Sequence, residues 1–151
     1  MYLIYSNFSM GNQASVKKIC FEDMQHIIKQ RKRNYLVINT LPPMEQGCLI
    51  PITIPSDKEE AIINRYMRGT KPAVIIYGKN TNDNSILKKY QQLEGLGFPR
   101  VYVYPGGMFE WLCLQDIYGK EAFPTTGTEL DILKFRPRSR LFTDHLLLEN
   151  A

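Results

Sequence analysis

The chain has 151 residues, a formal net charge of +4, and 44% hydrophobic and 23% charged residues. These proportions are those of an ordinary globular domain, and the length supports one buried core better than two. Because every apolar run is far shorter than a bilayer-spanning helix, we expect a single soluble domain.

The cysteines and histidines form no recognisable metal motif. They are Cys20, Cys48 and Cys113, with His26 and His145. Their spacing fits no zinc site, and the odd number of cysteines argues against a disulfide framework. The sequence also lacks the pattern of a secretory signal, so we expect a cytoplasmic protein that carries no metal or other cofactor.

Residues 1–18 show no regular pattern, and the first predicted helix follows them. Its apolar positions, at helical spacing, are Phe21, Met24, Ile27 and Ile28. The uninterrupted apolar run Tyr35–Thr40 then predicts a strand buried on both faces. A short strand is expected around Ile52–Ile54.

The next helix and strand have clear boundary signals. Ser56 and Glu59 form a capping-box pattern, which predicts a helix that runs to Gly69. A strand over Ala73–Tyr77 leads into a polar loop, and the following helix begins at Ser85. The residues of that helix expected to pack inward are Leu87, Tyr90, Leu93 and Leu96.

The last strand is predicted at Val101–Tyr104, after which Gly106 and Gly107 turn the chain into a helix that ends at Gly119. Its apolar residues are Phe109, Trp111, Leu112, Leu114 and Ile117. Strands that alternate with helices through short connections predict an α/β sandwich with a mostly parallel sheet. Residues 120–151 read as a C-terminal extension with one short helix near its end, and whether it packs on the domain or trails from it is left open.

The polar loop after Tyr77 is the candidate site. Ligands of open parallel sheets bind at the carboxyl ends of the strands, so the loops after Thr40, Tyr77 and Tyr104 should converge. Backbone N–H groups of this loop and of the next helix would form a cradle for a weakly bound anion or a peptide, although Asp83 would oppose a strongly negative ligand. The loop residues are Gly78, Lys79, Asn80, Thr81, Asn82, Asp83, Asn84 and Ser85.

Several segments, taken in order, resemble the rhodanese-like family, which includes sulfurtransferases and the catalytic domains of cell-cycle dual-specificity phosphatases. They are ICFEDMQHIIKQ, YLVINTLPP, LIPITIP, PAVIIYG and LEGLGFPRVYVYPGGMFEW, between Ile19 and Trp111. The resemblance implies a rhodanese-like three-layer sandwich over residues 19–119. It also implies a site at which family enzymes use a cysteine thiolate, activated by loop N–H groups and a helix dipole.

The chain departs from the family's active pattern at three places. The position that matches the cysteine is Gly78. A phosphatase loop would place arginine at Asn84, whose neutral amide lacks the charged fork that binds phosphate. The Asp-x-Arg of active relatives reads Asn39, Thr40, Leu41. We therefore predict a catalytically inactive module that binds, regulates or scaffolds an unknown protein partner.

Two alternatives to this prediction remain open. One is a sulfurtransferase or phosphatase that uses a non-standard cysteine, for which Cys48 is the best candidate. The other is nucleic-acid binding through basic clusters, although clusters this small are more typical of a solvated surface, and a nucleic-acid partner is not expected. The clusters are Lys29, Arg31, Lys32 and Arg33, and then Arg136, Arg138 and Arg140.

The segment MGNQAS, Met10–Ser15, matches the pattern for N-myristoylation. If translation starts at Met10, Gly11 would carry the lipid. Lys17 and Lys18 would then add attraction to acidic lipids, which gives a hypothesis of peripheral membrane contact. If Met1 is the start, the match is accidental.

Overall fold

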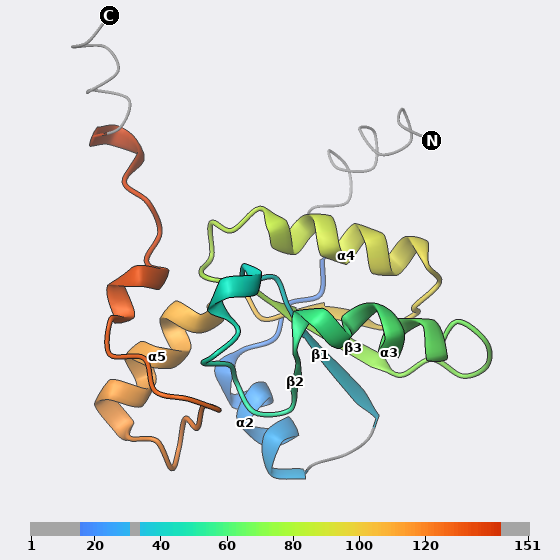
Figure 1. Ribbon diagram of the computed structural model, residues 1–151, viewed down its shortest axis with the longest axis horizontal. Coiled ribbons are helices and arrows are strands. Elements are labelled where there is room, and N and C mark those ends of the chain that lie inside the picture. The colour runs from blue at the N-terminus through green and yellow to red at the C-terminus, as the bar shows by residue number, and fades with distance from the viewer. Residues whose placement is uncertain (1–15, 31–33, 143–151) are drawn as a thin grey trace, which may run out of the picture.

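The computed structural model describes residues 16–30 and 34–142. Four parallel strands form one sheet in the order β2-β1-β3-β4 (Figure 1). The strands are β1 Tyr35–Asn39, β2 Thr53–Ile54, β3 Ala73–Tyr77 and β4 Val101–Val103. The predicted α/β sandwich is confirmed, and its sheet is parallel throughout.

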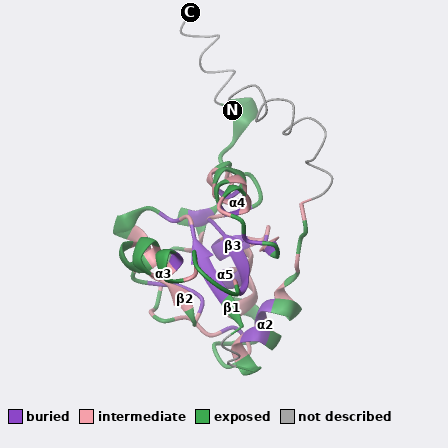
Figure 2. Ribbon diagram, turned by 90° about the vertical axis from the view of Figure 1, so that its right-hand side faces the viewer, coloured by how far each residue is buried: buried purple, intermediate pink, exposed green. Residues whose placement is uncertain are grey.

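Helices cover both faces of this sheet, as Figures 1 and 2 show. They are α2 Phe21–Gln30, α3 Glu59–Arg65, α4 Ser85–Gly95 and α5 Gly107–Tyr118. In β1, Val37 packs in the core with α2 and α5, whereas Leu36 and Ile38 pack in the core with α3 and α4. Because successive side chains of a strand point to opposite faces, an unbroken apolar strand supplies both cores, and three layers result.

The segment before α2 lies along the free edge of β4. Val103 N–H donates to the carbonyl of Lys17 at 2.9 Å, and Ile19 N–H donates to the carbonyl of Val103 at 2.8 Å. Lys18 accordingly forms a single parallel bridge with Val103. Backbone groups that an edge strand would otherwise leave unpaired are thereby satisfied.

The predicted capping box is wrong. Ser56–Lys58 form a 3-10 turn, η3, and α3 begins only at Glu59. Ser56 N–H donates to Gln46 Oε1 at 3.1 Å, while the Glu59 carboxylate pairs with Lys89 at 2.6 Å. Both groups have partners far away in sequence, and these replace the local reciprocal bonds that define a capping box.

The inward faces of two helices also differ from the prediction. In α4, Tyr90 and Leu93 are buried and Leu96 packs against the core as predicted, but the first buried position is Ile86, and Leu87 is 37% exposed. In α5, Ile117 is 70% exposed. α3 ends at Arg65 rather than continuing to Gly69.

The first part of the C-terminal extension packs on the domain. Phe123 and Phe135 are buried in the core beside α5, and η4, a short 3-10 helix, spans Ile132–Phe135. Trp111 Nε1 donates to the carbonyl of Pro124 at 2.8 Å, and its ring meets the ring of Phe123 edge-on at 5.1 Å between centroids. Residues 120–135 therefore complete the core on that side of the sheet.

Some expectations fall outside the part of the chain that the structure describes. Met10 and Gly11, on which the lipidation hypothesis rests, are among these residues. Residues 143–151, the end of the extension near which the short helix was predicted, also lie outside the described part. Among the described residues, none of the helices has the length and apolar character needed to span a bilayer.

Candidate functional site

The carboxyl ends of three strands converge on the loop after β3, as predicted. Thr40 N–H, just past β1, donates to the carbonyl of Tyr77 at 2.9 Å, and Met108 N–H, at the start of α5, donates to the carbonyl of Gly78 at 3.0 Å. The strand order reverses direction between β1 and β3. This is the switch point at which open α/β sheets form their ligand crevice, and Gly78 lies at it.

A side chain at Gly78 would force its neighbours to shift. A Cβ built on it would lie 2.6 Å from Thr40 Oγ1 and 2.9 Å from Ile86 Cγ1, and it would clash with the Asp83 carboxylate as well. The space that a nucleophilic side chain would need is filled by three neighbours. The loop has therefore closed around a glycine.

The Asp83 carboxylate occupies the anion cradle that the sequence predicted. Its Oδ2 accepts from Lys79 N–H at 3.0 Å, and its Oδ1 accepts from Ser85 N–H at 3.0 Å and from Ser85 Oγ at 2.5 Å. Ser85 Oγ is also 2.8 Å from Thr40 Oγ1. A further backbone group of the loop, Asn82 N–H, donates to Asn80 Oδ1 at 2.9 Å. The chain thus supplies its own anion to the loop.

Asn39 and Gln46 form a neutral amide pair at the carboxyl end of β1. Asn39 is 3% exposed; its Nδ2 donates to Gln46 Oε1 at 3.0 Å, and its Oδ1 accepts from Gln46 Nε2 at 2.8 Å. Leu41 packs in the apolar core. Asn84 is exposed at the start of α4. None of these three positions carries a charge.

The C-terminal extension reaches the loop through one buried contact. Asn80 is 7% exposed, and its Nδ2 donates to the carbonyl of Phe135 at 2.9 Å. This bond fixes the extension where it leaves η4. The residues that follow then run beside the loop and enclose a groove of about 850 Å³ between the two segments.

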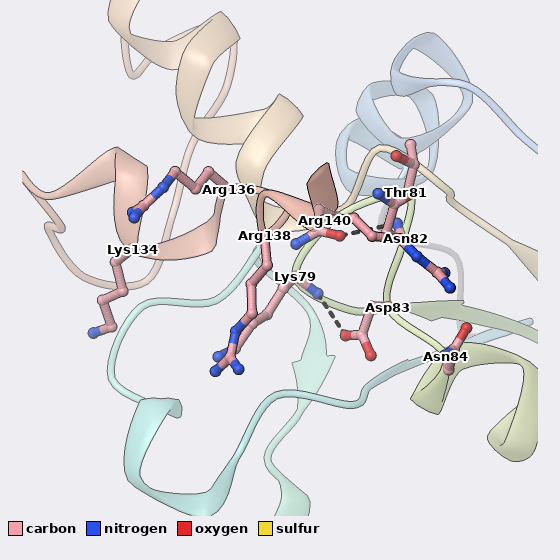
Figure 3. A pocket seen from close by; sticks show the side chains of 10 residues that line it. Lys79, Thr81, Asn82, Asp83, Asn84, Lys134, Arg136, Arg138 and Arg140 are labelled. Carbon is pink, nitrogen blue, oxygen red and sulfur yellow. Dashed lines mark hydrogen bonds between the residues drawn. The ribbon is translucent and has the colours of Figure 1, made fainter. Parts of the chain in front are cut away.

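Cationic side chains line this groove. They are Lys79 from the loop and Lys134, Arg136, Arg138 and Arg140 from the extension. Figure 3 shows Lys134 and Arg136 toward one end, Asn84 toward the other, and Lys79 and Arg138 between them. Within the part of the chain that the structure describes, Asp83 is the one acidic residue of the lining, and its oxygens accept from the loop's own donors.

Two of the cations form ion pairs with acids outside the groove lining. Lys79 Nζ lies 3.5 Å from Glu45 Oε2, and Lys134 Nζ lies 2.9 Å from Glu129 Oε1. The hydrogen bond to Glu129 raises the pKa of Lys134, so this ammonium group stays charged across the physiological range. An ammonium group has three donors, and one ion pair leaves the others available to a ligand.

The alternative nucleophile lies in the core. Cys48 is 9% exposed, and its Sγ contacts the carbonyl of Gly127 at 3.5 Å. Cys113 is partly exposed, and burial raises the pKa of its thiol. Among the described residues, no cluster of His, Cys, Asp and Glu side chains is suited to hold a metal ion.

No family profile and no curated protein matches the sequence. Solved structures do match. A protein from Bacillus halodurans aligns with a TM-score of 0.61 and 20% identity over 94% of this chain and 98% of its own. A protein from Anabaena aligns with a TM-score of 0.52 and 16% identity over 87% and 92% of the two chains, and an uncharacterized protein from Saccharomyces cerevisiae with 0.50 and 20% over 65% and 92%. At these identities the likeness concerns the fold alone.

Sequence reasoning named the basic cluster Arg136, Arg138 and Arg140 but missed the groove that it lines. With Lys134 these residues occupy every second position of the sequence, although Lys134 belongs to η4 and Arg140 to a helical turn, so the four do not form one extended segment. The cluster was a signal for a charged surface, but it does not say what that surface meets. Asn80 and Phe135, which decide the docking, are 55 positions apart.

Replacing Asp83 should destabilise the fold although the residue lies in a polar loop. We expect Asp83→Ala to lower the free energy of unfolding by about 2 kcal/mol, because backbone donors of Lys79 and Ser85 lose a charged acceptor. Urea denaturation measures this. Asp116→Ala, at an exposed position of α5, is the control and should change stability by less than about 0.5 kcal/mol. Equal effects of the two substitutions would show that the carboxylate does not hold the loop.

Proposed function

We propose that this chain is a catalytically inactive protein of the rhodanese-like family that acts by binding. The observation that carries the proposal is the loop after β3. Gly78 stands at the position of the nucleophile. The Asp83 carboxylate accepts hydrogen bonds from the N–H groups that would otherwise stabilise a thiolate or a phosphoryl group. The resemblance of the sequence segments and the α/β fold support the family assignment.

Three groups that the family's enzymes use for catalysis are absent from this edge of the sheet. The nucleophile is absent at Gly78, the charged fork is absent at Asn84, and the supporting ion pair is replaced by the Asn39–Gln46 amide pair. Any one of these changes would reduce activity by orders of magnitude in an enzyme that relies on it. Together they leave a rigid crevice with basic surroundings, which suits recognition better than turnover.

Turnover assays on the purified full chain test the proposal. We expect neither transfer of sulfur from thiosulfate to cyanide nor hydrolysis of an aryl phosphate above the rate of the buffer alone. The Cys48→Ser variant is assayed beside the parent chain, since Cys48 is the thiol that the competing hypothesis requires. Turnover by the parent that disappears in Cys48→Ser would replace the proposal with an enzyme that uses this cysteine.

A further inference from the structure

The groove between the loop and the extension has the composition of a polyanion site. Its ten lining side chains are all polar or charged, and five of them are cationic against one carboxylate. Because like charges repel, a cluster of this kind opposes folding unless something else compensates it. Lys79 and Lys134 have partners in Glu45 and Glu129, which do not line the groove. Among the residues that the structure describes, the lining therefore carries more positive than negative charge.

The cluster is built into the fold by the contact at Asn80. The buried hydrogen bond from Asn80 to the carbonyl of Phe135 joins the loop to the extension. Arg136 follows this contact directly, with an extended backbone, and Arg136 Nη1 donates to the carbonyl of Leu133 at 2.8 Å. The contact at Asn80 holds the loop and the extension together on the two sides of the groove. It therefore lowers the conformational entropy that is lost when a ligand binds.

The lining indicates which anion fits. Among the described residues of the lining there is no aromatic ring on which a nucleobase would stack, and no apolar side chain to seat the anchor residue of a peptide. The volume of about 850 Å³ is far larger than a single phosphate ion needs and falls in the range of small-molecule sites. Arginine forks bind the paired oxygens of phosphate groups.

We infer that this groove binds a compact molecule with several phosphate groups, held by Arg136, Arg138, Arg140, Lys79 and Lys134. The inference rests on the proposed function in one respect, that this face of the protein binds rather than reacts. The phosphates lie outside the loop cradle, because Asp83 already fills it. A free inositol polyphosphate and the headgroup of a phosphoinositide share this chemistry, and the experiment separates the two sources.

The first measurement is calorimetric titration of the full chain with myo-inositol hexakisphosphate. We expect binding that weakens at least roughly tenfold between about 50 and 200 mM salt, as several charge contacts require. Benzenehexacarboxylate, a compact polyanion without phosphate, should bind at least about tenfold more weakly. Equal affinity for the two compounds would overturn the inference, since it would show attraction to charge alone.

A charge-matched pair of variants locates the site. Arg138→Gln with Arg140→Gln should weaken hexakisphosphate binding at least about tenfold. The control, Arg68→Gln with Arg100→Gln, removes the same charge from exposed positions next to the amino ends of the strands, at the opposite edge of the sheet, and should change affinity less than about twofold. Thermal unfolding confirms that both variants fold. An equal loss in both pairs contradicts a specific groove.

Vesicle sedimentation identifies the source of the phosphates. Phosphatidylcholine vesicles that contain phosphatidylinositol bisphosphate are compared with vesicles of equal charge made with phosphatidylserine. Retention on the first kind alone assigns a lipid headgroup, and binding of free hexakisphosphate without retention on either assigns a soluble ligand; both results support the inference. Equal retention on both kinds, or no binding in any arm, overturns it.

Release of inorganic phosphate is measured in the same samples, so that the two proposals fail separately. Absence of binding together with absence of phosphate release removes the groove inference and leaves the inactive module standing. Phosphate release that depends on the protein removes the inactive module, and with it the premise that this face only binds.

Discussion

Gly107→Ala is expected to lower the free energy of unfolding by about 2 to 5 kcal/mol. Gly107 begins α5 with a φ of +64°, a conformation that costs a residue with a Cβ about 1–2 kcal/mol. An added Cβ would also lie 2.5 Å from the carbonyl oxygen of Gly78 and 3.0 Å from the carbonyl carbon of Lys79. These are backbone atoms, so the helix or the loop must shift, which adds about 1–3 kcal/mol.

Gly69→Ala separates the two contributions. Gly69 has a φ of +95°, and a Cβ there would meet nothing within 4 Å, so we expect a loss of about 1–2 kcal/mol from backbone conformation alone. Urea denaturation gives both values. The fluorescence of Trp111, the chain's single tryptophan, provides a local signal, because it is fully buried and lies one helical turn after Gly107. Equal losses in the two variants would mean that α5 and the loop do not pack as closely as their contact implies.

This contact links the stability of the fold to the shape of the candidate site. Phe109 N–H, in the first turn of α5, donates to the carbonyl of Lys79 at 2.9 Å, next to the bond from Met108 N–H to the carbonyl of Gly78. The first turn of α5 thus uses its unpaired donors on the loop after β3. The loop is therefore held both by N–H groups at the start of α5 and by the Asp83 carboxylate.

The sequence predicted the parts of the fold that depend on neighbours in the chain. β3 spans Ala73–Tyr77 and α4 begins at Ser85, both as expected, because a buried apolar run and the start of a helical pattern are local signals. The first buried position of α4 was harder to predict. Spacings from either Ile86 or Leu87 fit a helix, and only the position of the sheet selects Ile86.

The parts that depend on distant partners were not predictable in the same way. Glu59 suits a capping box, but Lys89 on a different helix competes for its carboxylate at 2.6 Å. The sequence also suggested that Asp83 would repel an anion, and the structure shows a more direct effect, since the carboxylate takes the place of one. Loop geometry decides between these two roles, and it depends on backbone dihedral angles that residue types do not determine.

The Asp83 carboxylate and an anionic ligand at position 78 exclude one another. Both need the N–H groups of Lys79 and Ser85, and a Cβ on Gly78 would overlap the carboxylate. A glycine at position 78 and closure of the loop on Asp83 are therefore mutually consistent. Under the proposed function, a thiol introduced at position 78 alone should not create a reactive site.

Gly78→Cys is accordingly expected to give an unreactive thiol. The nearby carboxylate disfavours the thiolate, and the loop donors are already occupied, so the pKa of the introduced thiol should lie at or above its ordinary value of about 8.5. Adding Asp83→Ala frees the donors of Lys79 and Ser85 and removes the like charge. The double variant should therefore react with iodoacetamide at neutral pH about tenfold faster than the single variant.

The experiment uses a background in which Cys20, Cys48 and Cys113 are replaced, so that alkylation reports position 78 alone. Gly78→Cys with Asn82→Ala is the matched control, because Asn82 is an exposed neutral residue of the same loop and its side chain holds none of the donors that Asp83 holds. The control should react at the rate of the single variant. A single variant that already reacts as fast as the double one would show that the carboxylate moves aside readily and does not keep the loop donors from a thiolate at position 78.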